Sequence, residues 1–264
     1  MEQVIDQPPL TWPDHQAVAH LPGSLPMGGV VPMTPVHAFV KTPDLLRWPV
    51  HTHLQPKRHD IDLGGLLAFV IEDLVTDQEA DAIMGASERM GYREEAPGIA
   101  TPPGMRMNKS VHWMADDAMM APLFKRMAQW LPPTLSVADL WPALSHRINM
   151  YRYDDSDVFN LHTDGSWPGY SLSEDRTEMQ VWDERISSGL TMLLYLNGAA
   201  DGVMGGNTRL YKRDGTSVDV SPVKGSALFF RHGFGLDSVR HVGCVVHGNV
   251  SKYVARINVM YSTP

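Results

Sequence analysis

The chain has 264 residues, which is enough for one large domain or two small ones. Apolar residues make up 43% of it and charged residues 20%, which is typical of a water-soluble protein with a substantial core. The formal net charge of -8 argues against nucleic acid or an anionic membrane surface as the main partner.

The sequence also bears on the cellular compartment. Cys244 is the one cysteine, so no disulfide can form within the chain, which fits a reducing environment. The first residues lack the basic and apolar regions of a signal peptide, and the longest apolar stretch, around Leu66 to Val70, is too short to span a bilayer. We therefore expect a cytoplasmic protein with no membrane partner. The sequence does not set the oligomeric state, and it allows a homodimer.

Residues 1–60 differ in composition from the rest of the chain. They hold 10 of the 20 prolines and 6 of the 12 histidines, with little hydrophobic periodicity. Because proline interrupts helices and central strands, we expect an extended arm here. Apolar residues such as Leu45 and Trp48 favour packing of this arm on the core, near the site entrance or at a subunit contact. Residues 61–264 are expected to form one globular domain.

Two helices are predicted in the first half of that domain. The segment Thr76–Glu79 is a capping box, in which the threonine caps the helix and the glutamate reaches back to it. Apolar residues then recur at helical spacing until Gly91, which is expected to end the helix. A second helix is predicted over residues 117–131, with Pro122 in its first turn and Pro132-Pro133 after its end.

Short strands separated by glycine and aspartate dominate the second half of the chain. The strands predicted there are His146–Tyr153, Phe159–His162, Leu190–Leu196, Thr208–Tyr211, Ala227–Arg231 and Tyr253–Tyr261. One further strand is predicted earlier in the chain, at Leu66–Ile71. Many short strands with turn signals are typical of a sandwich or a barrel-like core. Since the helices precede the strands, they are expected on one outer face. The predicted fold class is mainly β with flanking helices (α+β).

The tripeptide His162-Thr163-Asp164 is the feature most informative about function. Residues i and i+2 of a strand point to the same side, so His162 and Asp164 can act as neighbouring ligands. With His241 they supply two imidazoles and one carboxylate, the facial set that holds non-haem Fe(II) and leaves positions open. An H-x-D tripeptide alone is common, and an exposed histidine in a surface turn is the alternative interpretation.

Five motifs that follow this tripeptide agree in order with one known family. The chain resembles the prolyl-4-hydroxylase-like branch of the Fe(II)/2-oxoglutarate-dependent dioxygenases, whose pattern continues from H-x-D through LLYLN, GG-x-T and P-x-x-G-x-A-L-x-F to H-x-G and K-Y-x-x-R. The matching segments are Leu193–Asn197, Gly205–Tyr211, Pro222–Phe230, His241–Gly243 and Lys252–Tyr261. The resemblance covers about residues 66–261 and leaves residues 1–60 outside it.

The resemblance implies both a fold and an activity. The implied core is a double-stranded β-helix of the jelly-roll or cupin type. The implied enzyme uses Fe(II), 2-oxoglutarate and O2, with His162, Asp164 and His241 as the metal ligands and catalytic centre. The gap from His241 to Lys252 is one residue longer than the commonest family spacing, and Asn258 stands where the family usually has aspartate.

The distal histidine ligand has rivals in the sequence. His247 with Arg256 has a spacing similar to that of His241 with Lys252. His241 is favoured because the residues after it, Val242-Gly243, match the family motif. His232 is a weaker rival, for which a supporting or structural role is expected.

The co-substrate is implied to chelate the metal and to direct its far carboxylate at a buried cation. Lys252 is the candidate, because a carboxylate partner removes much of the cost of burying a lone lysine. Tyr153 and Tyr195 match family positions where a phenol helps to hold the co-substrate, and Thr191 is a further candidate on the same strand face as Tyr195. The alternatives are a solvated strand lysine and core tyrosines.

Four residues are candidates for substrate contact. Arg256 lies four residues after the candidate lysine on the same strand face, and Asn149 and Tyr151 point inward if the candidate tyrosine of their strand does. Trp167 follows the H-x-D tripeptide in a loop and can form part of a substrate lid. Structural pairing of the arginine and simple covering of apolar surface by the tryptophan are the alternatives.

The function expected from this reasoning is hydroxylation of an unactivated carbon of a small molecule, such as an amino-acid derivative or a natural-product intermediate, with release of succinate and CO2. Halogenating relatives lack the carboxylate ligand, so Asp164 points to hydroxylation, or to a desaturation or ring-forming variant. A hydroxylase that acts on prolyl or other side chains of a peptide is a second hypothesis. A non-catalytic cupin-like metal-binding sensor is a third.

Overall fold

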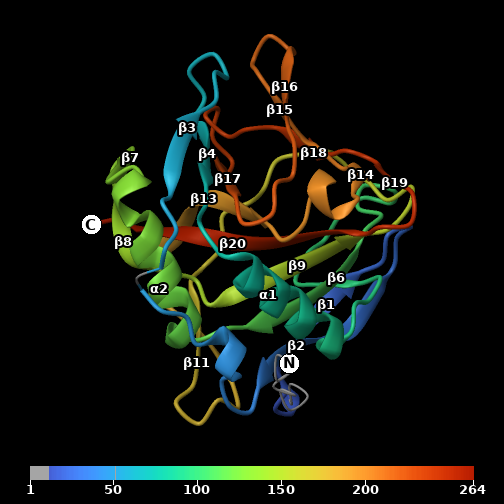
Figure 1. The fold of residues 1–264 in the computed structure, drawn as a ribbon, viewed down its shortest axis with the longest axis vertical. Helices are drawn as coiled ribbons and strands as arrows, with labels where there is room; N and C mark the ends of the chain where they lie inside the picture. Colours follow the sequence, from blue (N-terminus) through green and yellow to red (C-terminus); the bar gives the residue numbers. More distant parts are fainter. Residues whose placement is uncertain (1–11, 51) are drawn as a thin grey trace, which may run out of the picture.

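The computed structural model describes residues 12–50 and 52–264, and strands are the main regular structure among them. Figure 1 shows a large sheet that crosses the molecule and a smaller one beside it. The smaller sheet has the strand order β10 (Phe159–His162), β18 (His241–Gly243), β15 (Thr208–Tyr211) and β16 (Ser217–Val220).

Within residues 12–50 and 52–264, twelve strands form the large sheet. Its hydrogen-bonded order is β3 (Lys57–Asp60), β4 (Ala68–Glu72), β17 (Ala227–Arg231), β13 (Ile186–Tyr195), β20 (Lys252–Ser262), β9 (Arg147–Tyr153), β6 (Lys109–Met114), β2 (Val30–Phe39), β1 (His15–Ser24) and β5 (Ala96–Pro97). Two more strands join it beside β20, β8 (Ala138–Leu144) and β7 (Thr134–Leu135). Two short pairs lie outside both sheets: β11 (Tyr170–Leu172) with β12 (Met179–Val181), and β14 (Met204–Gly205) with β19 (Val246–His247).

Helix α1 (Asp77–Met90) begins at the capping box that the sequence predicts. The hydroxyl of Thr76 accepts a hydrogen bond from the backbone N–H of Glu79, and the Glu79 carboxylate accepts one from the N–H of Thr76. The helix ends at Gly91, whose φ of 87° suits glycine better than any residue with a Cβ. Both ends of this helix are therefore confirmed.

Helix α2 (Asp117–Met127) runs on into one of three short 3-10 helices, which are η1 (Asp44–Leu46), η2 (Ala128–Trp130) and η3 (Ala199–Asp201). The expected position of Pro122 in the first turn of α2 is wrong. The Asp116 side chain accepts from the N–H of Ala118 and starts the helix there, which places Pro122 inside it, beyond the first turn. Proline lacks the N–H that would complete the helical hydrogen bond at this position.

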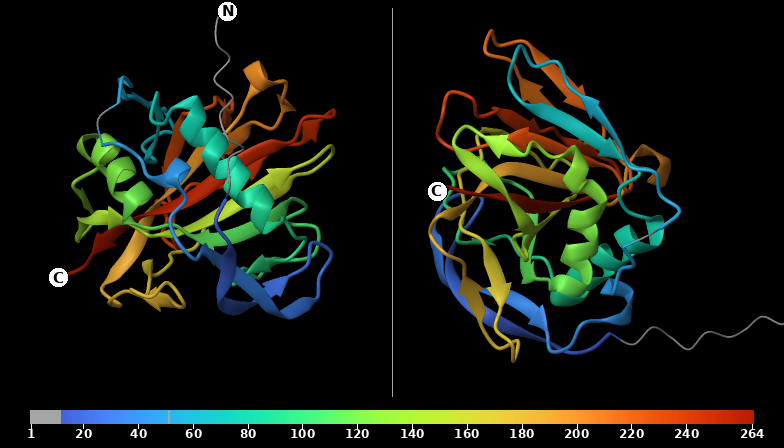
Figure 2. Two further views of the ribbon diagram at one scale, coloured as in Figure 1. Left: turned by 60° about the horizontal axis from the view of Figure 1, so that its bottom comes forward. Right: turned by 90° about the vertical axis from the view of Figure 1, so that its left-hand side faces the viewer.

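The alternation of strand side chains divides the core into two layers. Phe229 of β17 belongs to the cluster that packs under α1 and α2, whereas its neighbours Leu228 and Phe230 belong to the cluster between the two sheets. Full burial of each such side chain contributes about 1.5–3 kcal/mol. Figure 2 shows both helices beside the large sheet, and the shared cluster places them on the face away from β15 and β16. The expectation of a mainly β fold with helices on one outer face is confirmed.

The same alternation brings polar residues into the space between the sheets. In β20, Val254 packs between the sheets while Ala255 packs under the helices, so Lys252 and Arg256 share the inner face with Val254. Both are buried, at 2% and 4% exposure. Buried charges on an inner sheet face are costly unless they meet partners, so this face is where a binding site is expected.

The segment 12–50 contributes strands to the large sheet. Strands β1 and β2 pair with each other in antiparallel fashion, and β2 pairs in parallel with β6. The regular pairing of these proline-containing strands is not evident from hydrophobic periodicity. The arm predicted over residues 1–60 includes residues 1–11, which lie outside the described residues, and the domain boundary near residue 60 stays a prediction. In the described part of the chain, no helix is long and apolar enough to cross a membrane.

Glu79 has a second partner that its role in the capping box does not predict. Its carboxylate accepts two hydrogen bonds from the guanidinium of Arg126, at 2.7 and 2.8 Å, and both residues are buried. We expect Glu79→Gln to lower the free energy of unfolding by about 3–5 kcal/mol, because the change leaves a buried guanidinium without its charge partner. Urea denaturation measures the difference. Asp219→Asn, at the exposed pair with Arg209, is the control and should leave the midpoint nearly unchanged. Equal effects of the two substitutions would contradict this account.

Candidate metal centre

Three side chains from two paired strands and the turn after one of them meet at the edge of the smaller sheet. His162 ends β10, His241 begins β18, and these two residues are register partners. Asp164 follows His162 by two residues. His162 Nε2 lies 3.7 Å from Asp164 Oδ1, and His241 Nε2 lies 4.0 Å from Asp164 Oδ2. One ligand atom from each residue falls within 4.8 Å of the others.

The two histidines present the nitrogen that a metal needs. The Nδ1 atom of His162 lies 2.6 Å from the carbonyl oxygen of Asn160, and that of His241 lies 3.3 Å from the carbonyl oxygen of Val239. An Nδ1–H that donates to a carbonyl leaves Nε2 unprotonated and directed at the ligand position. Burial lowers the pKa of His162, and it lowers the pKa of His241 to about 3. Both rings are therefore neutral near neutral pH.

The Asp164 carboxylate is held in its ionised form by its neighbours. Burial opposes ionisation, but the Arg256 guanidinium and the two histidines outweigh it and hold the pKa of the Asp164 carboxyl well below its usual value. Arg256 Nε donates to Asp164 Oδ2 at 3.0 Å, and the Thr191 hydroxyl donates to the same oxygen at 2.6 Å. One carboxylate oxygen is thus fixed by the protein, which leaves the other for a metal.

The Thr191 hydroxyl is itself held in place by His232. Its hydroxyl lies 2.8 Å from His232 Nδ1, and His232 Nε2 lies 2.8 Å from the Ser188 hydroxyl. Burial lowers the pKa of His232 to about 4, so this ring is neutral. His232 therefore contacts Thr191 and Ser188 and lies outside the group of three that can share a metal.

The residues fit a metal ion by donor type and by spacing. Histidine nitrogens and carboxylate oxygens bind transition metals at about 2.0–2.2 Å, so adjacent donors on one ion lie about 3 Å apart. The three ligand atoms lie within 4.8 Å of one another, so sharing one ion requires them to approach by up to about 2 Å. Two neutral imidazoles and one carboxylate on one side form the facial set that suits Fe(II).

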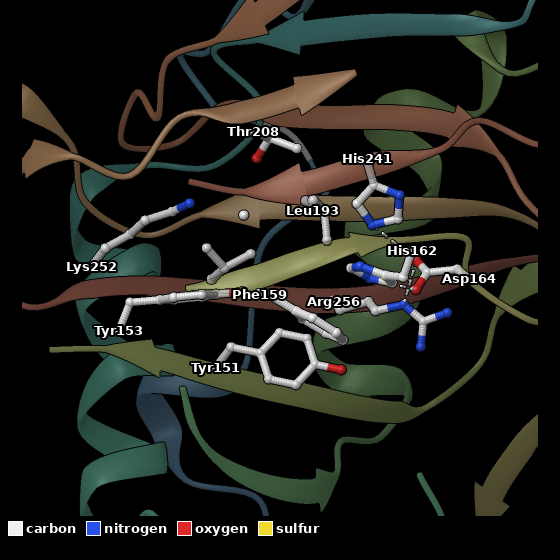
Figure 3. A pocket seen from close by; sticks show the side chains of 12 residues that line it. Tyr151, Tyr153, Phe159, His162, Asp164, Leu193, Thr208, His241, Lys252 and Arg256 are labelled. Atoms are coloured by element: carbon white, nitrogen blue, oxygen red, sulfur yellow. Dashed lines mark hydrogen bonds and ion pairs between the residues drawn. The ribbon is translucent and has the colours of Figure 1, made fainter. Parts of the chain in front are cut away.

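His162, Asp164 and His241 line one end of a pocket between the two sheets, the inner pocket. Lys252 lies at its far end, as Figure 3 shows. Its ammonium donates to the carbonyl oxygen of Gly206 at 2.5 Å and lies 5.1 and 5.6 Å from the ring centres of Tyr153 and Tyr195. No carboxylate lies within 4 Å of this ammonium among the residues that the structure describes. Burial lowers the pKa of Lys252 to about 8.

The backbone makes room for the lysine at Gly206. A Cβ on Gly206 would approach Lys252 Cδ to 2.9 Å, and the φ of this glycine is +69°. Thr208, two residues further on, lines the pocket and accepts a hydrogen bond at 2.8 Å from the Tyr195 hydroxyl. Tyr195 thus contacts Thr208 and stays outside the pocket lining, whereas Tyr153 lines the pocket directly.

A second cavity, the outer cavity, opens on the other side of the three candidate ligands. Its volume is about 390 Å³, and it is lined by residues 98–102 and 163–167 together with Tyr151, Phe159, His162, Phe234 and Arg256. Of the four predicted substrate residues, Tyr151, Trp167 and Arg256 line this cavity. Asn149 is buried beside them on β9, outside the lining, and its Oδ1 has no hydrogen-bond partner among the described residues.

The structure places the remaining candidates as follows. Thr191, predicted to contact the co-substrate, is bonded to Asp164 and lies outside the lining of the inner pocket. His247, the rival to His241, is exposed on β19 and lies outside the group of three. Phe159 was not singled out by the sequence, yet its ring stacks on His162 with centroids 3.7 Å apart. The sequence does contain a signal for Phe159, since this residue begins the short predicted strand that leads to His162.

Comparison with known proteins gives a likeness of structure. No protein-family model matches the chain, and no curated protein matches its sequence. The viral collagen prolyl hydroxylase of Paramecium bursaria Chlorella virus-1, solved with 2-oxoglutarate, is similar over 76% of this chain and 99% of its own, at 16% identity and a TM-score of 0.50. A Pseudomonas putida prolyl-4-hydroxylase matches over 77% and 96% of the two chains, at 18% identity and a TM-score of 0.47.

At this level of identity the likeness to the viral enzyme concerns the fold. The large sheet and the four-stranded sheet face each other, and the two candidate histidine ligands lie on strands of the smaller one. The chain thus shares its fold with the viral enzyme, and the prediction of a double-stranded β-helix core is confirmed.

His241 and His247 give a matched test of the metal ligands. We expect His241→Ala to lose bound Fe(II) on dialysis, because only two donors remain. His247→Ala should retain as much iron as the wild type, since His247 is exposed and outside the group. Metal analysis after anaerobic loading measures both. Iron loss in the His247 variant alone would show that the assignment of the distal ligand is wrong.

Proposed function

We propose that the protein is a non-haem Fe(II)- and 2-oxoglutarate-dependent dioxygenase that hydroxylates an unactivated carbon of a small molecule. The observation that carries the proposal is that one pocket holds a set of candidate metal ligands at one end and a buried cation at the other. A facial set of His162, Asp164 and His241 lies at one end, and the buried ammonium of Lys252 lies at the other, with no carboxylate within 4 Å among the described residues. A metal at the first end and a dicarboxylate between the two supply the missing charges.

The residues of the pocket suit 2-oxoglutarate. Its far carboxylate meets the ammonium of Lys252, which stands where desolvation makes an unpaired charge costly. Tyr153 lines the wall beside the lysine, and Thr208 lines the wall opposite. The viral enzyme that shares the fold was solved with 2-oxoglutarate, which supports the same co-substrate here.

When bound, Fe(II), 2-oxoglutarate and O2 supply an oxidant that acts on unreactive C–H bonds, with succinate and CO2 as the products of the co-substrate. The protein sets the geometry of this chemistry. Thr191 and Arg256 fix one oxygen of Asp164, so the carboxylate keeps its orientation when the other oxygen binds the metal. Phe159 stacks on His162 and limits the movement of that ring. The burial of the pocket excludes water from the reacting atoms.

A small-molecule substrate is favoured by the size of the outer cavity. A volume of about 390 Å³ lies within the range of small-ligand sites, and loops at residues 98–102 and 163–167 form its walls. The second candidate is hydroxylation of a peptide side chain, which the likeness to a viral collagen prolyl hydroxylase favours. The non-catalytic sensor is disfavoured by the joint presence of the three candidate ligands and the buried lysine.

Succinate formation tests the activity. The wild type with Fe(II), 2-oxoglutarate and O2 should release succinate, and a substrate should raise the rate. Asp164→Ala should reduce the rate by at least about a hundredfold, because the metal loses its anionic ligand. Asp214→Ala, at an exposed turn, is the control and should match the wild type. Full activity of the Asp164 variant would refute the metal assignment, and stimulation by proline-rich peptides alone would favour the peptide hydroxylase.

The pH dependence of co-substrate binding tests Lys252. Its pKa of about 8 in the free protein means that the ammonium is present below pH 8 and is lost as the pH rises above it. We expect the Kd for 2-oxoglutarate to be flat below pH 8 and to rise up to about tenfold per pH unit above it, because only the charged lysine attracts the carboxylate. Anaerobic calorimetry measures this. Lys252→Arg keeps its charge and should show a flat profile. A wild-type Kd that stays constant from pH 7 to 9.5 would contradict the role.

A further inference from the structure

The outer cavity contains positive charge that the proposed metal centre uses only in part. Arg256 lines it, and while its Nε donates to Asp164, its Nη2 has no hydrogen-bond partner among the described residues. Figure 3 shows the guanidinium end of Arg256 and the hydroxyl of Tyr151 on the Asp164 side of the site, away from Lys252. The described residues give that hydroxyl no hydrogen bond either, although Tyr151 is only 4% exposed.

Arg147 adds a second buried charge at the same wall. It is 4% exposed, and its Nε and Nη1 atoms have no partner within the described ranges. Its remaining nitrogen, Nη2, contacts the carbonyl oxygen of Pro97 and His112 Nδ1. The terminal nitrogens lie 3.5 and 3.7 Å from where a Cβ of Gly98 would stand, and Gly98 lines the cavity. Gly98, which has no side chain, therefore lies between this guanidinium and the cavity.

Trp167 joins the two arginines. The guanidinium carbon of Arg147 lies 5.1 Å from the centre of the Trp167 ring, and that of Arg256 lies 5.9 Å from it. The two buried like charges repel, and burial together with the charge of Arg256 lowers the pKa of Arg147. Arginine keeps its charge near neutral pH despite such a shift.

The charges around the site do not balance without a further anion. In the proposed complex, the ferrous ion and Lys252 cancel the carboxylate of Asp164 and the two carboxylates of 2-oxoglutarate. The charges of Arg147 and Arg256 remain. Arg126, which is also buried, shows the usual solution, since it has the Glu79 carboxylate as its partner. No carboxylate of the described residues lies within 4 Å of Arg147.

We propose that the outer cavity binds the substrate through an anionic group, held by the guanidinium of Arg256 and the hydroxyl of Tyr151 in the field of Arg147. The substrate class is therefore a small organic acid. This inference rests on the proposed function for its chemical step, while the anion site itself does not depend on the metal or on 2-oxoglutarate.

The apolar residues that line the outer cavity indicate the chemical nature of the rest of the substrate. Ile99, Pro102 and Phe234 contribute apolar surface to the cavity. The side chain of Phe234 is 93% exposed, so a bound substrate can cover it. A substrate with an acidic group at Arg256 and an apolar body along this wall covers both surfaces. Its carbon nearest His162 and Asp164 is then the one presented for reaction, because these two candidate ligands line the cavity.

Trifluoroacetate tests the anion site directly, because it is small, carries one carboxylate and is visible by 19F NMR. The metal-free Lys252→Met protein removes the competing lysine site. We expect this protein to bind trifluoroacetate with a Kd at least about tenfold lower than that for trifluoroacetamide, the neutral analogue, as charge-assisted hydrogen bonds predict. Equal and weak binding of the two probes would overturn the proposal.

Variants locate the binding in the same background. Arg256→Gln and Arg147→Gln should each weaken trifluoroacetate binding by about tenfold or more, and Tyr151→Phe by less, because it removes a neutral donor. Arg126→Gln is the matched control: it also removes a buried guanidinium, but its contacts are with Glu79 and the backbone, so it should leave binding unchanged. Should Arg147→Gln fail to fold, Arg147→Lys preserves the charge and should retain binding. Unchanged affinity in both glutamine variants would overturn the proposal.

Turnover separates this inference from the proposed function. In the Fe(II)- and 2-oxoglutarate-loaded wild type, a set of small carboxylic acids should stimulate succinate release, and the matching amides should not. Stimulation by the amides alone would overturn the anionic substrate and leave the dioxygenase standing. Trifluoroacetate binding that depends on Arg256, in a protein that binds no iron, would refute the dioxygenase and keep the anion site.

Discussion

The buried ion pair between Asp164 and Arg256 determines how the rest of the site is arranged. A carboxylate in this position needs a cation or a metal to stay ionised, and Arg256 supplies part of that charge at 3.0 Å. Thr191 holds the same oxygen, so the carboxylate presents its other oxygen, Oδ1, towards His162. Only the Nε of this guanidinium donates a hydrogen bond among the described residues, so its two terminal nitrogens are left for the outer cavity. The metal centre and the outer cavity therefore share one pair of residues.

The fold explains why these charges can be buried together. The inner faces of β9, β13 and β20 lie between two sheets, and their outer faces pack on helices whose contacts are almost entirely apolar. The apolar layer provides stability, so the inner layer can carry polar side chains that are matched to ligands. The polar residues occupy alternate positions in each strand, so the two functions do not compete for the same side chains.

Much of this arrangement could be predicted from the sequence. Strands β10, β15 and β17 have the bounds that glycine and aspartate punctuation predicts, and the capping box fixes the start of α1. The pairing of β1 and β2 with the sheet was not predicted, because proline-containing strands show little periodicity and their pairing is nonlocal. The contact of Thr191 with Asp164 was missed for the same kind of reason. Alternation tells which face a residue occupies, and only the folded chain tells which neighbour it meets there.

Strand β20 carries both Lys252 and Arg256, four residues apart on one face. One strand therefore sets the distance between the cation at the inner end of the pocket and the cation at the outer end. Since side chains alternate along a strand, the gain or loss of a single residue between them would turn one of the two towards the helices. Natural variation in this stretch should thus proceed by substitution and not by changes of length. The geometry of the strand backbone sets the distance between the two cations, and with it the combined length available to co-substrate and substrate.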